Sequence, residues 1–178
     1  YLFCDEFTNY NHADIGKKAI LILERLGYEV IIPDHKESGR TYLSKGFVTE
    51  AKALARCNVQ KLSPLVNDAI PIIGIEPSAI LTFRDEYLDL ADADWKLAAE
   101  HLARYALTME EFLDQEMLRG NIAQTAFISD TKKIKIHGHC YQKAFQLMQH
   151  TKNILSFPAN YAVELIPSGC CGMAGSFG

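Results

Sequence analysis

The sequence predicts an α/β protein made of two related small lobes, with mainly parallel sheets and pseudo-two-fold symmetry between the lobes. Two observations lead to this prediction. Short apolar runs typical of buried strands alternate with segments of helical periodicity, and the two ends of the chain resemble each other. Strands that alternate with helices form layered α/β folds with right-handed crossovers.

The first part of the chain contains three apolar runs and two segments of helical periodicity. Residues 13–26 carry apolar side chains at helical spacing, and Gly27 ends this pattern. Residues 70–75 form a continuous apolar run, which suits a strand buried on both faces of a parallel sheet. The expected elements are strands at residues 1–4, 28–33 and 70–75 and helices at residues 13–26 and 47–66.

The rest of the chain continues the alternation. Residues 91–120 are expected to be helical, with a break near Thr108, where Thr108-Met109-Glu110-Glu111 forms a capping box. A strand at 133–137, a helix at 141–150 and a strand at 162–166 follow. We therefore expect a first half at residues 1–90, a helical connector at 91–130, and a second half at 131–178 that is truncated at its C-terminus.

An internal repeat links the two halves. The segment that starts at Tyr28 aligns without a gap on the segment that starts at Tyr161. The aligned pairs are Glu37 with Cys170, Ser38 with Cys171 and Gly39 with Gly172, and Cys4 then corresponds to Cys140 with a small difference in length. The first half has thus lost the cysteine pair that the second half keeps.

Composition sets the class of protein. The 178 residues are 48% hydrophobic, with a net charge of -4 and a pI of about 5.9, so the chain has no electrostatic footprint for nucleic acid. No run approaches the length of a membrane span. Five cysteines, an odd number, without a signal peptide indicate a reducing compartment, either the cytoplasm or the inner face of the inner membrane. Because the chain opens on Tyr1 and ends just after its cysteine loop, we expect a piece of a longer polypeptide.

The cysteines carry the chemistry. Cys170 and Cys171 lie between glycines, which let the backbone bend around a metal centre, and Cys140 follows a strand-like run thirty residues earlier. Packing alone accounts for Cys57, which stands in a helical stretch. Two alternatives remain open. One is a structural Zn²⁺ site of the three thiolates with a histidine such as His139; the other is a thiol hydrolase with Cys140 as nucleophile and His139 as base.

These motifs also resemble a known family. The run Gly39-Arg40 to Ser44-Lys45-Gly46 and Cys140 followed by Cys170-Cys171-Gly172 resemble the cysteine-rich CCG domain found in heterodisulfide reductase and in the iron-sulfur subunit of glycolate oxidase. Two further segments are similar to the C-terminal part of FAD-linked oxidases fused to Fe-S oxidoreductase modules. They are Gly74-Ile75-Glu76-Pro77-Ser78 and His137-Gly138-His139-Cys140.

The resemblance implies a function and a ligand set. It implies an electron-transfer module of a larger FAD-dependent 2-hydroxy acid dehydrogenase, in which FAD lies on another domain and a 4Fe-4S cluster on this one. Cys140, Cys170 and Cys171 match cluster ligands, with the remaining ligand beyond Gly178. The implied partners are a flavin domain and a ferredoxin-like domain of the same polypeptide, and a downstream acceptor.

The first half departs from the family pattern, and this sets limits on where a cluster binds. Glu37-Ser38-Gly39 replaces the CCG motif, and Glu76-Pro77-Ser78-Ala79 replaces C-x-x-C, so this half is expected to hold no cluster. Glu37, Glu76 and Arg40 form either an ion-pair relic of the lost site or ordinary solvated charges. With one ligand missing, residues 1–178 alone are expected to be inactive, and to be empty or to hold zinc.

Overall fold

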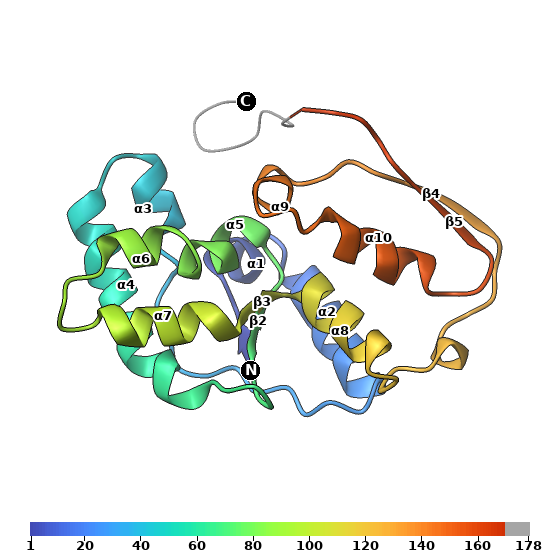
Figure 1. Cartoon of the computed structure of the whole chain (residues 1–178), viewed down its shortest axis with the longest axis horizontal. Helices are drawn as coiled ribbons and strands as arrows, with labels where there is room; N and C mark the ends of the chain where they lie inside the picture. Colours follow the sequence, from blue (N-terminus) through green and yellow to red (C-terminus); the bar gives the residue numbers. More distant parts are fainter. Residues whose placement is uncertain (170–178) are drawn as a thin grey trace. The chain divides into compact units, whose positions relative to one another are not determined.

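The computed structural model describes residues 1–169, and these residues confirm the α/β class. They form two compact units, Tyr1–Thr108 and a second unit that begins at Met109. Each unit contains one small parallel sheet, of three strands in the first unit and two in the second (Figure 1). The boundary after Thr108 lies inside the segment for which a helical connector was expected. None of the described helices has both the length and the apolar character needed to cross a bilayer.

The sheet of the first unit is short and parallel, and all of its residues except the half-buried Leu107 are buried. It runs β1 (Leu2–Phe3), β2 (Ile72–Gly74) and β3 (Ala106–Thr108) in that order, with Leu2 opposite Ile73 and Ile73 opposite Leu107. All three residues of β2 are buried, as the continuous apolar run predicted. At Gly74 a Cβ would lie 2.4 Å from the Cβ of Ile80, so only glycine allows the chain to approach this closely.

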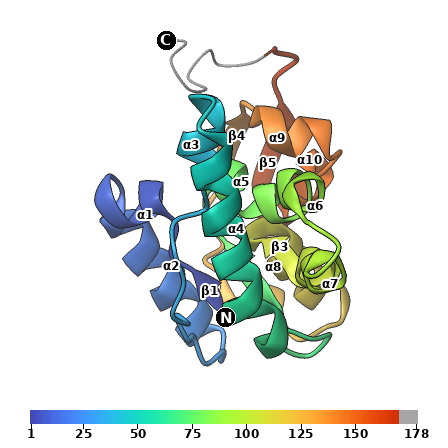
Figure 2. The same cartoon turned by 90° about the vertical axis from the view of Figure 1, so that its left-hand side faces the viewer.

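Helices surround this sheet and bury an aromatic core. Their bounds are α1 (Glu6–Tyr10), α2 (Ala13–Arg25), α3 (Arg40–Ser44), α4 (Val48–Leu62), η1 (Ser63–Leu65), α5 (Pro77–Ile80), η2 (Leu81–Phe83), α6 (Glu86–Leu90) and α7 (Lys96–Tyr105). Helices α4, α6 and α7 pack against one another, and α1 packs on α2 (Figure 2). The ring of Phe83 lies 4.8 Å from that of Phe3 and 4.7 Å from that of Tyr87, which ties β1 to α6.

Residues 28–33, predicted to be a strand, form no regular strand. One backbone hydrogen bond, from the Leu2 amide to the Ile31 carbonyl (2.9 Å), places this segment beside β1. The Tyr1 carbonyl accepts from the Ile73 amide, and it points opposite to the Leu2 amide of the same peptide unit. The segment therefore lies on the edge of β1 away from β2, where a strand would lie, but β1 is too short to form a ladder with it.

The second unit is built around a two-stranded parallel sheet. Its elements are α8 (Met109–Leu118), η3 (Gln124–Ala126), β4 (Lys132–Ile136), α9 (Cys140–Ala144), α10 (Met148–Ser156) and β5 (Tyr161–Leu165). Ile134 pairs with Val163 and Ile136 with Leu165, so these apolar side chains share one face. Helix α10 packs on β5 and on α8 (Figure 1).

Two predicted helices are interrupted in the structure. The expected helical stretch 91–120 contains β3, and the expected helix at 141–150 is two helices, α9 and α10. Gln146 lies between them with a φ of 59°, in the left-handed region that ends a helix. Even so, both units follow one path: a strand, a short helix, a longer helix, then a segment beside the first strand. This order agrees with the predicted repeat.

Candidate metal centre

Cys140 lies at the carboxyl edge of the β4–β5 sheet. It is the first residue of α9 and follows the last residue of β4, Ile136, by four positions. Ile136 pairs with Leu165, the last residue of β5, and Cys170 comes five positions after Leu165. Because the strands are parallel, both connections leave the same edge of the sheet. Cys170 and Cys171 themselves lie outside the described residues.

Lys143 joins the two connections at this edge. From α9 its ammonium donates to the carbonyl oxygens of Ser168 (2.7 Å) and Gly169 (2.8 Å), the two residues before Cys170. These are charge-assisted hydrogen bonds, which are shorter and stronger than neutral ones. The backbone that leads into the cysteine pair is thereby bound to the helix that begins with Cys140.

His139 is held by the helix that it precedes. It is the N-cap of α9, and its Nδ1 accepts a hydrogen bond from the Tyr141 amide (3.2 Å). A neutral ring that accepts at Nδ1 carries its proton on Nε2, so in this arrangement neither nitrogen offers a lone pair to a metal. This weighs against His139 as a fourth ligand and as the base of a thiol hydrolase.

The described part of the chain holds no complete metal site. Its cysteines, Cys4, Cys57 and Cys140, are all half-buried and form no disulfide within this part of the chain. No three histidine, cysteine or acidic side chains within residues 1–169 lie close enough to hold an ion. A metal site that includes the cysteine pair at 170 and 171 stays a prediction from the sequence.

In the first unit, hydrogen bonds occupy the place of the cysteine pair. Ser38, which aligns with Cys171, is fully buried, and the carboxylate of Glu6 on α1 accepts both from its amide (2.9 Å) and from its hydroxyl (2.6 Å). A carboxylate that accepts two short hydrogen bonds satisfies both donors of Ser38. Glu6 stands two positions after Cys4, on the helix that corresponds to α9.

A second set of hydrogen bonds, from Asn58 and Tyr87, holds the backbone of residues 36–38. The Asn58 side chain accepts from the Lys36 amide (2.7 Å) and donates to the Glu37 carbonyl (2.9 Å) and to the Tyr87 hydroxyl (2.9 Å). Tyr87, fully buried, donates in turn to the Ser38 carbonyl (2.9 Å). Burial raises the pKa of Tyr87, so its hydroxyl remains a donor at any ordinary pH.

Of the three cysteines in the second unit, only Cys140 has a cysteine at the aligned position of the first unit, namely Cys4. Its amide donates to Nε2 of His35 (3.3 Å), and the pKa of its thiol is raised, first by burial and then by the charge of Asp5. A raised pKa leaves less of the thiolate that a metal needs. Together with the closed loop around Ser38, this donor set does not fit an iron-sulfur cluster.

The charged residues expected near the first site have separate partners. Arg40 forms a half-buried ion pair with Glu86. Glu76 caps α5, where its carboxylate accepts from the amide (3.2 Å) and hydroxyl (2.7 Å) of Ser78. The backbone carbonyl of Glu37 accepts a hydrogen bond from the Asn58 side chain. Glu6, Asn58 and Tyr87 were not singled out from the sequence, because only the fold brings these distant positions together.

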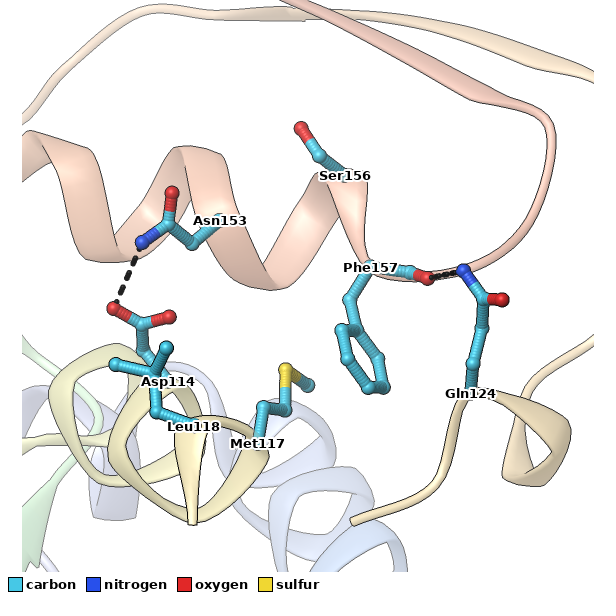
Figure 3. Close-up of a pocket in the computed structure, with 7 residues that line it drawn as sticks. All are labelled: Asp114, Met117, Leu118, Gln124, Asn153, Ser156 and Phe157. Carbon is cyan, nitrogen blue, oxygen red and sulfur yellow. Dashed lines mark hydrogen bonds between the residues drawn. The ribbon is translucent and has the colours of Figure 1, made fainter. Parts of the chain in front are cut away.

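The second unit also has a cavity of about 400 Å³, which the sequence did not predict. Its lining includes Asp114, Met117, Leu118, Gln124, Asn153, Ser156 and Phe157 (Figure 3). The buried carboxylate of Asp114 accepts from Nδ1 of His150 (2.7 Å) and from the side-chain Nδ2 of Asn153 (3.0 Å), which fixes α8 against α10. The cavity lies toward Ser156, at the C-terminal end of α10. The connection between β4 and α9 lies beside Met148, at the N-terminal end of the same helix. The two ends are about 12 Å apart along the helix axis.

Comparison with known proteins relates the whole chain to parts of larger oxidoreductases. It is 26% identical over 185 residues to D-2-hydroxyglutarate dehydrogenase of Haemophilus influenzae, a match that spans 100% of this chain and 17% of that protein. It is also 26% identical to one subunit of the anaerobic glycerol-3-phosphate dehydrogenase of Escherichia coli K12, over 97% of this chain and 42% of that polypeptide.

A third relative is lactate utilization protein A of Bacillus velezensis, 22% identical over 99% of this chain and 73% of that protein. No family model and no solved structure matches the chain. The chain thus spans about one sixth of the 2-hydroxyglutarate dehydrogenase and under half of the glycerol-3-phosphate dehydrogenase polypeptide. At this level of identity it is a distant relative of dehydrogenases and their subunits.

Proposed function

We propose that this chain is the electron-transfer module of a larger FAD-dependent 2-hydroxy acid dehydrogenase, passing electrons from the flavin through an iron-sulfur cluster to an acceptor. The observation that carries the proposal is the shared sheet edge, from which Cys140 and the backbone leading to Cys170 both emerge. The names of two relatives support the substrate class, since 2-hydroxyglutarate and lactate are both 2-hydroxy acids.

Cys140, Cys170 and Cys171 would hold the cluster in the proposed module. Ordinary 4Fe-4S clusters use four thiolates, so a fourth ligand must come from elsewhere in the full-length protein. A thiolate-bound cluster accepts one electron at a time and so connects a two-electron flavin to an acceptor. The flavin domain and a ferredoxin-like domain of the same polypeptide are the proposed partners.

The first unit supports the proposal by contrast. Its loop follows the same path, but Ser38 is hydrogen-bonded to Glu6 and Tyr87, and Asn58 holds the neighbouring Glu37 carbonyl, which leaves Ser38 no role as a ligand. One cluster per chain is therefore expected, in the second unit. A structural zinc site is the alternative, and the arrangement of His139 weighs against it.

The test separates the two half-reactions in the full-length protein, purified without oxygen. Cys140→Ser and Cys170→Ser are each expected to abolish iron and sulfide binding, because alkoxide ligands suit iron-sulfur chemistry poorly. Flavin reduction by the 2-hydroxy acid survives in both variants, whereas transfer to the acceptor is lost. Cys57→Ser, a substitution of another half-buried free thiol, is the matched control and leaves both steps intact.

Analysis of the metal and sulfide content of the full-length protein can contradict the proposed iron-sulfur cluster. Zinc in place of iron, with no sulfide and no colour, would show that the thiolates hold a structural ion. Equal loss of flavin reduction and of acceptor reduction in a folded Cys170→Ser variant would show that the loop belongs to the substrate site and not to an electron path.

A further inference from the structure

Three segments of the second unit converge on the side chain of Lys143. Lys143 belongs to α9, and its ammonium donates to both carbonyls that precede Cys170 and to the hydroxyl of Ser168 (3.3 Å). The third segment is the β4–α9 connection at Gly138, where an added Cβ would lie 2.8 Å from Cε of Lys143 and 2.7 Å from Sδ of Met148. The stem of the lysine thus lies directly on the backbone of Gly138.

This arrangement fixes the side chain at both ends. Gly138 is buried and leaves no space for a Cβ, so the stem of Lys143 has a defined path along the connection. At the far end the ammonium has three oxygen acceptors, enough to use all of its protons. A lysine held in this way has lost most of its rotamer freedom, which a solvated surface lysine keeps.

The first unit has a corresponding contact of opposite charge. Glu6 lies two positions after Cys4 on α1, the short helix that follows β1. Lys143 lies three positions after Cys140 on α9, the short helix that follows β4. Glu6 accepts from the amide and hydroxyl of Ser38, whereas Lys143 donates to the carbonyls of Ser168 and Gly169. The same loop is therefore bound by an anion in one unit and by a cation in the other.

We propose that Lys143 is a positioning residue: it fixes the backbone of Ser168 and Gly169 against α9, so that the connection to the cysteine pair starts close to the helix of Cys140 before any metal binds. The anchoring itself rests on the contacts above, and its effect on metal binding rests on the proposed function. The charge of Lys143 suits this place, because a nearby cation offsets the negative charge of thiolates, whereas a carboxylate such as Glu6 would repel them.

The test compares Lys143→Met, which keeps the length of the stem and removes the donors, with Lys143→Arg, which restores donors to the two carbonyls. Lys133→Met is the matched control, since Lys133 is an exposed lysine of the same unit on β4. Amide hydrogen exchange of the metal-free protein over residues 164–170 is the first measurement. We expect exchange to rise roughly tenfold in Lys143→Met, in keeping with the loss of charge-assisted hydrogen bonds.

The second measurement is titration of the reduced, metal-free protein with Co²⁺ alone, followed by the thiolate-to-cobalt absorption. Loss of a residue that orients metal ligands lowers metal affinity on the order of 10-fold to 100-fold. We expect this loss in Lys143→Met, partial rescue in Lys143→Arg and none in Lys133→Met.

The two proposals fail in distinguishable ways. In one outcome, exchange is faster in Lys143→Met, but neither the unsubstituted protein nor any variant binds cobalt. That result would support the anchoring role of Lys143 and overturn the proposed metal site. Cobalt binding and exchange that are equal in Lys143→Met and Lys133→Met would overturn the anchor and retain the metal site.

Discussion

Single residues distinguish the two units at otherwise corresponding places. Ser38 stands in the register of Cys171, and the buried carboxylate of Glu6 occupies both of its hydrogen-bond donors. A serine in this position is a neutral donor that a carboxylate can satisfy, whereas a thiolate would be repelled by it. Glu6 and Ser38 thus satisfy each other's hydrogen bonds, and the pair needs no metal.

Replacement of Glu6 with Ala is expected to destabilise the first unit by about 3 kcal/mol, because it leaves the buried amide and hydroxyl of Ser38 without an acceptor. Urea unfolding followed by circular dichroism measures the change. Glu24→Ala, on the exposed face of α2, is the control and is expected to change stability by less than about 0.5 kcal/mol. Equal stability of the two variants would contradict the role of the buried carboxylate.

The sequence was most informative at the level of residue type. The cysteines, the replaced CCG motif and its loop were recognisable, because metal ligands and glycine-rich loops leave a local signature. Asn58 and Tyr87 were not recognisable as part of the same site. Asn58 stands in the expected helix at 47–66 and Tyr87 lies outside every expected element, and their hydrogen bonds to Glu37 and Ser38 join positions that are distant in the chain.

At the scale of elements, the longest periodic segments were predicted best. Helices α2 and α4 and the strands β4 and β5 are long enough to show their period. The three residues of β3 were missed within a helical pattern, because a short strand is defined by its pairing with β2 and not by its own sequence. Residues 28–33 show the reverse: a strand-like sequence whose partner β1 has two residues.

Close packing of elements gives a prediction at Gly74, where β2 passes α5. Gly74→Ala is expected to destabilise the protein by about 2 kcal/mol, since the new methyl group would lie 2.4 Å from Cβ of Ile80, an atom fixed to the helix backbone. Thermal unfolding measures this effect. Gly169→Ala is the control, because no atom of residues 1–169 lies within 4 Å of a Cβ at that position. A neutral Gly74→Ala would mean that β2 and α5 can separate at little cost.

At the scale of the whole molecule, the core is divided unevenly between the units. Among the described residues, the buried hydrophobic side chains all belong to the first unit except Leu113, Ile122, Ile136 and Leu147. The second unit has a two-stranded sheet with few buried apolar side chains. Small units of this kind commonly depend on a metal or a partner for stability.

Hydrogen exchange tests this difference between the units. Amides of β4 and β5 are expected to exchange through openings on the order of 2 kcal/mol less costly than those of β2 and β3. Loading the full-length protein with the proposed cluster is expected to reduce this gap, because a ligand that binds only the folded unit stabilises that unit. Protection of β4 equal to that of β2 in the metal-free protein would contradict it.

The pairing of β4 with β5 has a further consequence for metal affinity. Cys140 and Cys170 are thirty residues apart in the chain, and in a flexible polypeptide their approach would cost about 3 kcal/mol of loop-closure entropy. Here the register of Ile136 with Leu165 closes that loop during folding, through strand hydrogen bonds alone. For the proposed site this is a chelate effect built into the backbone, about a hundredfold in affinity, that a metal-binding peptide of the same sequence would lack.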